Sequence, residues 1–120
     1  MVVEYYERSD GSAPAEAFIL AQPVKMRAKI LRNLTLLEAM GTKLREPYSA
    51  HLKDGIYEIR SQVAGDITRV LFFFYAGDRA VLTNWFVKKS QKTPQSEIEK
   101  AVAYRADYLR RNGQHGTKHP

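Results

Sequence analysis

Three basic side chains interrupt patterns that otherwise predict strands of a folded core. Arg60 lies in the middle of Ile56–Val63, where polar and apolar residues alternate as they do along a half-buried strand. Arg69 lies within Ile67–Tyr75, a run that is otherwise apolar and aromatic, and Lys88 directly follows a third such run. Guanidinium and ammonium groups stabilise anionic oxygens, so a site that gathers these three residues could bind a phosphate group and stabilise charge on it.

Each of these residues also has a structural interpretation. Arg60 could pair with Glu58, its neighbour on the same strand face, or with another acidic residue. Burying Arg69 without a partner would be expensive, so its side chain either reaches a carboxylate or lines a cleft. Lys88 shares a strand face with Phe86, so that an ammonium group and a ring could meet one nucleotide. The alternative is that Phe86 belongs to the core and Lys88 to a solvated loop.

The charge of the chain favours an anionic ligand. The net charge is +6 and uneven: residues 1–24 hold four acidic and one basic side chain, whereas residues 25–120 hold nine acidic and 18 basic ones. A polyanion-binding protein needs such a basic body, because each neutralised phosphate releases counterions. The alternative is a basic surface that only aids solubility. On the first interpretation Lys89 and Lys92 are further phosphate contacts, and Lys53 is a weaker candidate.

The composition excludes several kinds of site. The chain has no cysteine, which excludes a disulfide framework, a thiolate metal site and a cysteine nucleophile. No cluster of metal-binding residues is visible, and we predict neither a metal nor another cofactor. The N-terminus reaches charge at Glu4, and the longest apolar stretch, Val70–Ala76, is far shorter than the ~20 residues of a membrane helix. We therefore expect a soluble, cytoplasmic protein without membrane contact.

The first half of the sequence predicts one strand and two helices. The strand is Val2–Tyr6, which is rich in β-branched and aromatic residues. A helix follows Ser12, which could cap it, and ends before Pro23, where a second helix begins and runs to Gly41. Thr42–Lys53 shows little periodicity and is predicted to be irregular.

The second half predicts a meander of strands and a closing helix. Ile56–Val63, Ile67–Tyr75 and Ala80–Val87 are joined by short turns, as three consecutive antiparallel strands would be. After a basic loop, Thr93 is predicted to cap a last helix that ends at Gly113. The fold class is therefore α+β, with a small antiparallel sheet, two N-terminal helices and a C-terminal helix.

These elements amount to one domain. A chain of 120 residues can bury roughly two thirds of the surface that its unfolded state exposes, which suffices for folding without a disulfide or a metal. We assign residues 1–113 to this domain. Residues 114–120 hold no apolar residue and are predicted to be a flexible tail.

Four motifs follow one another in the second half of the chain. They are Leu-Lys-Asp-Gly-Ile-Tyr-Glu-Ile-Arg at residues 52–60, Thr-Arg-Val-Leu-Phe-Phe-Phe at 68–74, Asn-Trp-Phe-Val-Lys-Lys-Ser-Gln-Lys-Thr-Pro at 84–94 and Glu-Ile-Glu-Lys-Ala at 97–101. From about Leu52 to Tyr108 the chain thereby resembles the phage-derived, HigB-like branch of the RelE/ParE toxin superfamily. The order and spacing of the four motifs carry the resemblance, since none of them is diagnostic alone.

The resemblance implies a RelE-like fold and the activity of a type II toxin, namely ribosome-dependent, metal-independent endonucleolytic cleavage of messenger RNA. In that reaction the 2′-oxygen of the RNA attacks the adjacent phosphate, which basic residues on the concave sheet face hold in place. The resemblance and the patterns together predict Arg60, Arg69 and Lys88 as catalytic residues and, as RNA contacts, Lys53, Phe86, Lys89 and Lys92.

The resemblance also implies partners and leaves alternatives. The expected partners are a small helix-turn-helix antitoxin of the HigA kind, the ribosome with its messenger RNA, and operator DNA reached only through the toxin–antitoxin complex. A toxin of the ParE kind, which poisons DNA gyrase without catalysis, would share the fold, and so would an inert RNA-binding domain. The three basic residues favour the nuclease, because ParE-type proteins generally lack this set.

The sequence does not identify the groups that would move protons. His51 precedes the predicted meander and could approach a cleft, while His115 and His119 lie in the predicted tail. Tyr104 and Tyr108 lie on the last predicted helix, from which either could face the cleft or pack on the sheet. The general acid and base therefore stay open.

Overall fold

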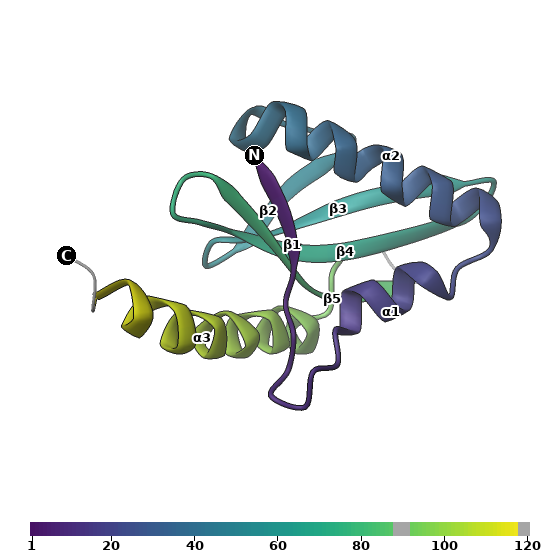
Figure 1. Cartoon of the computed structure of the whole chain (residues 1–120). Coiled ribbons are helices and arrows are strands. Elements are labelled where there is room, and N and C mark those ends of the chain that lie inside the picture. The colour runs from purple at the N-terminus through teal and green to yellow at the C-terminus, as the bar shows by residue number, and fades with distance from the viewer. Residues whose placement is uncertain (88–91, 118–120) are drawn as a thin grey trace.

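The chain forms a five-stranded sheet with helices on both faces (Figure 1). The computed structural model describes residues 1–87 and 92–117, of which residues 113–117 are given by their backbone. The elements are, in chain order, β1 (Val2–Tyr5), α1 (Pro14–Leu20), α2 (Val24–Met40), the 3-10 turn η1 (Gly41–Lys43), β2 (Ser49–Lys53), β3 (Ile56–Val63), β4 (Asp66–Tyr75), β5 (Arg79–Val87) and α3 (Gln95–Thr117).

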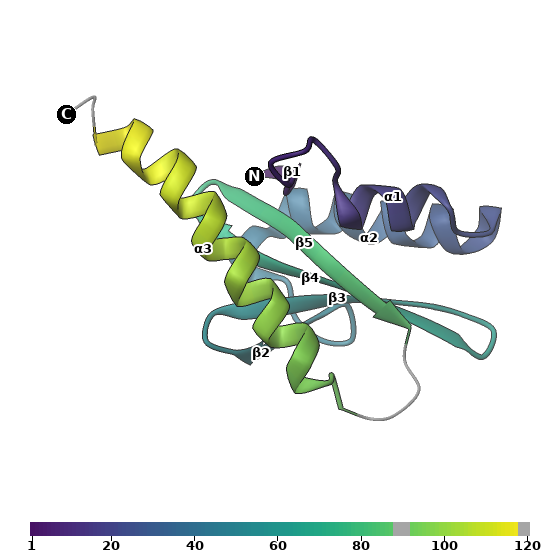
Figure 2. The same ribbon diagram turned by 90° about the horizontal axis from the view of Figure 1, so that it is seen from below.

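The strands lie in the order β1-β5-β4-β3-β2. The pairs from β2 to β5 are antiparallel, and β1 adds to β5 in parallel. Helices α1 and α2 cover one face of the sheet and α3 crosses the other, as Figure 2 shows from below. This confirms the predicted α+β class with two N-terminal helices and a C-terminal helix, and it is consistent with a RelE-like fold.

Two apolar clusters hold the helices to the sheet. On β4, Phe72 belongs to the cluster under α1 and α2, and the next residue, Phe73, belongs to the cluster under α3, because side chains alternate along a strand. Ile30 and Leu37 of α2 are fully buried against the first face. Each such side chain contributes about 1.5–3 kcal/mol to folding. Among the described residues no helix is long and apolar enough to cross a membrane.

Two predicted boundaries were wrong. Thr42–Lys53, predicted to be irregular, contains β2 at Ser49–Lys53, which pairs with β3 although it has no run of apolar residues. The last helix continues through Gly113 to Thr117, because a glycine costs a helix only about 1 kcal/mol and does not have to end it.

Both predicted hydroxyl caps act elsewhere. Ser12 Oγ donates to Asp10 at 2.6 Å, and the residue that caps α1 is Ala13, without a side-chain bond. Thr93 Oγ1 donates to Glu58 Oε1 at 2.7 Å. The carbonyl of Pro94 accepts a hydrogen bond from the amide of Ile98 at 3.3 Å, so that the helix begins one residue later than predicted.

Two strands extend beyond their outer neighbours, which leaves two open edges. The β2–β3 pairing runs to Ile59, and the last backbone bond joins Arg60 N to Tyr48 O at 2.9 Å. On the other side, β1 pairs with β5 as far as Leu82. Among the described residues no strand pairs beyond these points on either edge, so both edges are open to side chains and ligands.

Candidate active site

Arg69 is part of a buried ion pair. Its side chain is 5% exposed, and Nη1 donates a 2.8 Å hydrogen bond to Oε2 of Glu58, whose side chain is fully buried. The same Nη1 donates to the hydroxyl of Thr93 at 3.3 Å, and that hydroxyl in turn donates to Glu58. Arg69 was predicted either to reach a carboxylate or to line a cleft, and it does reach a carboxylate. The cleft is present as well, because Arg69 also lines the hollow described below.

Arg60 lies directly across the ladder from Arg69, since the two residues are paired between β3 and β4. Its Nε donates to Glu58 Oε2 at 2.6 Å and its Nη1 donates to Glu46 Oε1 at 2.8 Å. The hydrogen bond to Glu58 raises the pKa of Arg60 above its ordinary value, so the guanidinium stays charged. The predicted pairing of Arg60 with Glu58 is confirmed, and with 30% of its side chain exposed Arg60 remains accessible.

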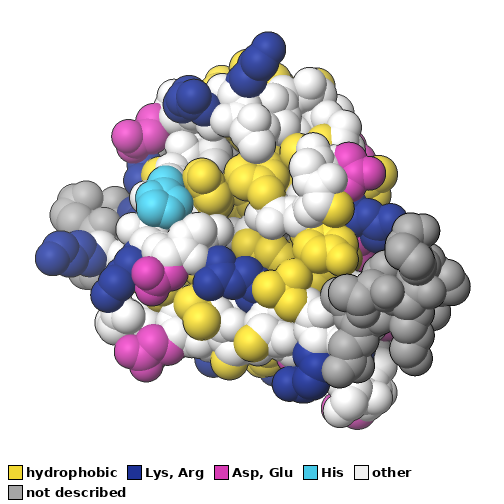
Figure 3. Space-filling model, turned by 90° about the vertical axis from the view of Figure 1, so that its left-hand side faces the viewer, with side chains coloured by type: hydrophobic (Ala, Val, Ile, Leu, Met, Phe, Trp, Pro, Cys, Tyr) yellow, Lys and Arg dark blue, Asp and Glu magenta, His cyan; other side chains and the backbone are white. Residues whose placement is uncertain are grey.

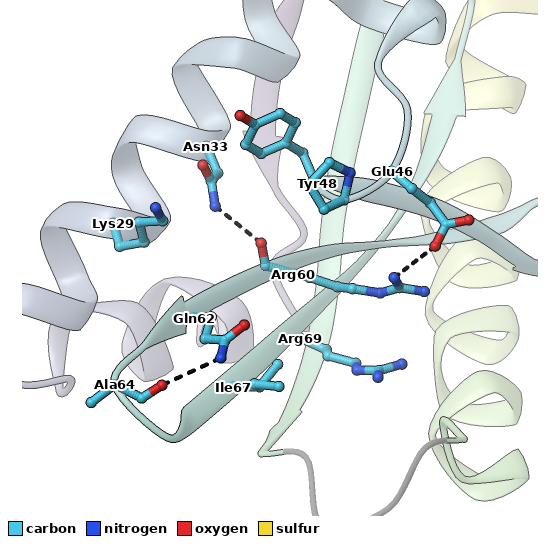
Figure 4. A pocket seen from close by; sticks show the side chains of 10 residues that line it. Lys29, Asn33, Glu46, Tyr48, Arg60, Gln62, Ala64, Ile67 and Arg69 are labelled. Carbon is cyan, nitrogen blue, oxygen red and sulfur yellow. Dashed lines mark hydrogen bonds and ion pairs between the residues drawn. The ribbon is translucent and has the colours of Figure 1, made fainter.

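An open cleft of about 870 Å³ lies where β3 extends beyond β2 (Figure 4). Arg60 and Arg69 line it from the sheet, Lys29 from α2, and Glu46 and Tyr48 from the segment before β2. Figure 4 shows the Tyr48 ring on the α2 side of β3 and the two guanidinium groups on the other side of the strand. A cleft of this size can hold a small ligand or part of a longer chain.

Asn33 fixes the helical wall of this cleft. It is 1% exposed, and its Nδ2 donates to Arg60 O and to Ser61 Oγ, at 3.0 Å each. The side-chain amide of Asn33 thus bonds to the edge of β3 at the point where the pairing with β2 has ended. Because Lys29 lies one helical turn before Asn33, this contact also sets where the ammonium group of Lys29 enters the cleft.

The cleft offers charge rather than proton transfer. Its described lining holds the three cations Lys29, Arg60 and Arg69 against the single carboxylate of Glu46. Arg60 and Arg69 can stabilise a phosphate on their side of β3, and Lys29 adds a positive charge from the α2 side. Among the described lining residues, Glu46 and Tyr48 are the side chains that could exchange a proton with a substrate besides Lys29. The described residues contain no group of three or more His, Cys, Asp or Glu side chains that could hold a metal ion.

Comparison with known proteins identifies the family of this chain. The family model for Phage derived protein Gp49-like (DUF891) matches residues 17–105, well over half of the 120 residues. The chain belongs to this family. The Gp49-like family is part of the RelE/HigB-like toxin group, which agrees with the resemblance of the four motifs. The matched region includes β2 to β5, both cleft arginines and the first half of α3. No curated protein matches the chain.

Four more predicted residues of the Gp49-like chain are Phe86, Lys88, Lys89 and Lys92. Phe86 is paired with Arg69 across the β4–β5 ladder and is 9% exposed, with the guanidinium carbon of Arg69 5.6 Å from its ring centre. Its ring therefore packs in the core under Arg69, as the structural alternative held. Lys92 is exposed and directly precedes Thr93. Lys88 and Lys89 lie outside the described residues.

Two other candidates of the Gp49-like chain lie away from the cleft. Lys53 pairs with Ile56 at the opposite end of β3 from Arg60, four residues and roughly 13 Å further along the strand. The ring of His51 lies 4.9 Å from that of Tyr57, and its Nε2 accepts a hydrogen bond from the amide of Gly55 at 3.3 Å. Figure 3 views this end of the molecule, where hydrophobic side chains gather beside the histidine.

The tyrosines of α3 pack on the sheet and on β1. Tyr108 is 4% exposed and its hydroxyl donates to Glu4 at 3.0 Å. Tyr104 stacks on Tyr6, with ring centres 4.6 Å apart. Of the two predicted orientations, packing is the one that the structure gives. His115 and His119, the other proton-transfer candidates, lie outside the described side chains.

Five polar residues of the cleft were not among the predicted site residues, namely Lys29, Asn33, Glu46, Tyr48 and Gln62. For Lys29 a signal existed, because Lys25, Lys29 and Arg32 form a basic stripe at helical spacing. The stripe by itself is typical of a solvated helix face. Gln62 also had a signal, because alternation along β3 places it on the face of Arg60. For Asn33, Glu46 and Tyr48 the sequence held no signal, since these side chains reach the cleft through the packing of α2 and of the segment before β2 against β3.

Proposed function

We propose that this chain is the toxin of a type II toxin–antitoxin system, a ribosome-dependent endoribonuclease that cleaves messenger RNA in the cytoplasm. One observation carries the proposal: in a member of the Gp49-like family, Arg60 and Arg69 lie side by side on two paired strands at an open cleft. The net charge of +6 is in keeping with an RNA substrate.

In the proposed reaction the 2′-oxygen of a bound nucleotide attacks the adjacent phosphorus, and the bond to the 5′-oxygen of the next nucleotide breaks. The products are a cyclic 2′,3′-phosphate and a free 5′-hydroxyl. Arg60 donates to a non-bridging phosphate oxygen through Nη2, because its Nε bonds to Glu58 and its Nη1 to Glu46. Arg69 holds Glu58 in place and, through it, Arg60. Lys29 supplies a second cation from the helical wall. Lys88, Lys89 and Lys92 remain candidates for the flanking phosphates.

The need for the ribosome is a further part of the proposal. The described cleft binds charge well but has few side chains that exchange a proton near neutral pH. Much of the rate must then come from holding the 2′-oxygen, the phosphorus and the leaving oxygen in line, and a codon fixed by the ribosome would supply that alignment. Free RNA is therefore expected to be a poor substrate.

A second candidate function rests on the Glu58 contacts. Glu58 neutralises much of the charge of both arginines, and Arg69 is almost fully buried. If the arginine pair serves only to hold β3 to β4, the protein would be a binding toxin of the ParE kind that poisons DNA gyrase. In that case growth would stop while messenger RNA stayed intact.

The test induces the protein in a bacterium and maps cuts in an abundant message by primer extension, with translation running and then blocked. Cuts inside translated regions that vanish when translation is blocked support the proposal. Growth arrest with intact messages contradicts it and favours the gyrase toxin. RNA that is bound but never cut, without growth arrest, would point to an inert RNA-binding domain.

Arg60→Ala and Arg79→Ala form a matched pair for this test. Both arginines are partly exposed, lie on a strand and pair with a glutamate. Arg79, however, pairs with Glu4 of β1, at the opposite edge of the sheet from the cleft. Removing one preorganised donor to a reacting phosphate costs on the order of 10²–10³ in rate. We therefore expect Arg60→Ala to abolish the cuts and Arg79→Ala to keep them. Equal cutting by both variants would exclude Arg60 from the reaction.

The proposal includes an antitoxin of the helix-turn-helix, HigA-like kind that binds the toxin and reaches operator DNA only as a complex. Such an antitoxin would cover the cleft or the surface that docks on the ribosome. Co-expression should restore growth, and the complex should co-purify and shift an operator fragment that the toxin alone leaves unshifted. A toxin that shifts the fragment by itself would contradict this arrangement.

A further inference from the structure

A second hollow of about 490 Å³ lies at the other open edge of the sheet, where β5 extends beyond β1. Its wall is formed by Trp85 of β5, by Arg8 of the segment after β1, and by Lys100 and Tyr104 of α3. None of these residues belongs to the arginine cleft. The hollow therefore combines two cations with two large aromatic rings at a free strand edge.

Trp85 offers a flat ring that is already held in place. Its ring stacks on Phe18 of α1, with centres 4.1 Å apart and planes 12° from parallel. The residue is nevertheless 39% exposed, unusually high for the largest aromatic side chain. A ring that is packed on one side and open to solvent can receive a second flat ring at little entropic cost.

The two cations are positioned at this hollow by different contacts. Arg8 is exposed, and its Nη2 and Nε donate to the Tyr104 hydroxyl at 2.9 and 3.3 Å, while Nη1 donates to Ser12 Oγ at 3.3 Å. Lys100 is half-exposed, with Nζ 3.7 Å from Glu97 Oε1. That carboxylate oxygen also accepts a hydrogen bond from Asn84 at 3.0 Å, so its charge is shared between two partners.

We infer that this hollow is a nucleotide subsite, in which a base of single-stranded RNA stacks on Trp85 and the adjoining phosphate binds Arg8 and Lys100. The inference rests on the proposed function, because it takes the RNA to be a flank of the strand held in the arginine cleft. Aromatic platforms beside basic side chains are the usual means of binding single strands. An apolar protein partner seated in this hollow would also bury the charges of Arg8, Lys100 and Glu97, which favours a partner that carries charge beside its flat rings.

The position of the hollow fits a continuous strand. Phe86, the neighbour of Trp85, is paired with Arg69 of the cleft across the β4–β5 ladder. The two open edges, on β3 and on β5, are separated by two strand spacings, about 10 Å. An RNA that crosses the end of the sheet could therefore reach both the cleft and Trp85 within a few nucleotides.

Trp85 is the only tryptophan of the chain, so its fluorescence reports on the hollow directly. The probe is a single-stranded RNA of about a dozen nucleotides with 2′-O-methyl groups, which removes the attacking oxygen and prevents cleavage. We expect saturable quenching of Trp85 with the same dissociation constant as the anisotropy of a labelled probe. Trp85→Leu keeps an apolar side chain on Phe18 and should weaken binding about five- to a hundredfold, the effect of removing one base stack.

Lys100→Ala and Lys43→Ala serve as a matched pair, since both lysines are exposed but Lys43 lies in η1, away from both hollows. Lys100→Ala should weaken binding and lower the dependence of affinity on salt by about one phosphate contact, whereas Lys43→Ala should change neither. Unchanged Trp85 fluorescence at saturating probe, or wild-type affinity of Trp85→Leu, would overturn the inference. Quenching that persists in a protein without cleavage activity would uphold the subsite while contradicting the proposed function.

Discussion

At the scale of single residues, Glu58 decides how the two arginines are presented. Its fully buried carboxylate accepts hydrogen bonds from Arg60, Arg69 and Thr93. One cation is thereby fixed in the core, and the other is held with its outer Nη atoms toward the cleft. A preorganised guanidinium does not have to be ordered when a phosphate arrives, which is the feature that favours electrostatic stabilisation.

The buried pair predicts a large stability effect at Arg69. Arg69→Ala leaves the buried carboxylate of Glu58 with Arg60 as its remaining cation, and breaking a buried ion pair costs up to about 3–5 kcal/mol. Urea unfolding followed by circular dichroism measures the loss. Arg79→Ala, which removes a more exposed pair, should cost less than about 1 kcal/mol.

A double variant distinguishes the effect of the buried charges of Glu58 and Arg69 from the effect of their packing. Glu58→Leu combined with Arg69→Met removes both buried charges while keeping apolar volume, so most of the lost stability should return. If the double variant is as unstable as Arg69→Ala, the cause is the lost packing and not the loss of one of the two cations that pair with Glu58. The double variant should in either case cleave no message, because Arg60 then lacks its support.

At the scale of elements, the contact between α2 and β3 forms the cleft. The pairing of β2 with β3 ends beside Arg60, and there the side-chain amide of Asn33 bonds to the edge of β3 in place of a strand residue. The same helix then contributes Lys29 to the wall. The cleft thus depends on a helix–strand contact between residues 27 positions apart in the chain.

Asn33→Ala tests this contact. The change leaves the Arg60 carbonyl and the Ser61 hydroxyl without their donor in a buried place, which should lower the free energy of unfolding by about 1–3 kcal/mol. Thr35→Ala is the control, because its hydroxyl bonds only to Leu31 O on the exposed side of α2. Equal stability of the two variants would mean that Asn33 does not hold the helix to the strand.

At the scale of the whole molecule, the ends of the chain and the charges are arranged around the sheet. Tyr108 of α3 bonds to Glu4 of β1, 104 positions away, and Glu4 also pairs with Arg79. Glu4, Glu7 and Glu16 line a hollow at this edge, whereas the arginine cleft lies at the opposite edge of the sheet. Such a separation of charge orients an approaching polyanion toward the arginine cleft and away from the acidic hollow at Glu4, Glu7 and Glu16.

The Tyr108 contact predicts a loss of stability in alkali. Burial, followed by the hydrogen bond to Glu4, raises the pKa of Tyr108 from 10.0 to about 12. The folded state therefore keeps its proton where the unfolded state has lost it, so the contribution is intact below pH 10 and disappears between about pH 10 and 12. Tyr108→Phe removes this titration, and its unfolding free energy should fall less steeply over that window. Identical slopes in urea titrations across the window would contradict the assignment.

The sequence by itself determined the class of the fold, the polar strand face on which Arg60 lies and the position of Arg69 within an apolar strand. Alternation along β3 and the apolar run of β4 are local patterns, set by which side chains a strand turns to each side. The same alternation predicted that Phe86 shares a strand face with Lys88, which lies outside the described residues. The turns predicted that the three strands of the meander are neighbours, as the sheet order confirms. The four motifs gave the toxin group, which the Gp49-like family membership confirms.

The tertiary structure alone decided what surrounds those arginines. Glu46 and Tyr48 reach the cleft from a segment without periodicity, and Asn33 reaches it from a helix whose pattern marks only its apolar face. The exposure of Trp85 depends on where β1 ends beside β5. Each of these contacts joins elements that are distant in the chain, and their geometry follows from the packing of whole helices and strands, which no local spacing of residues encodes.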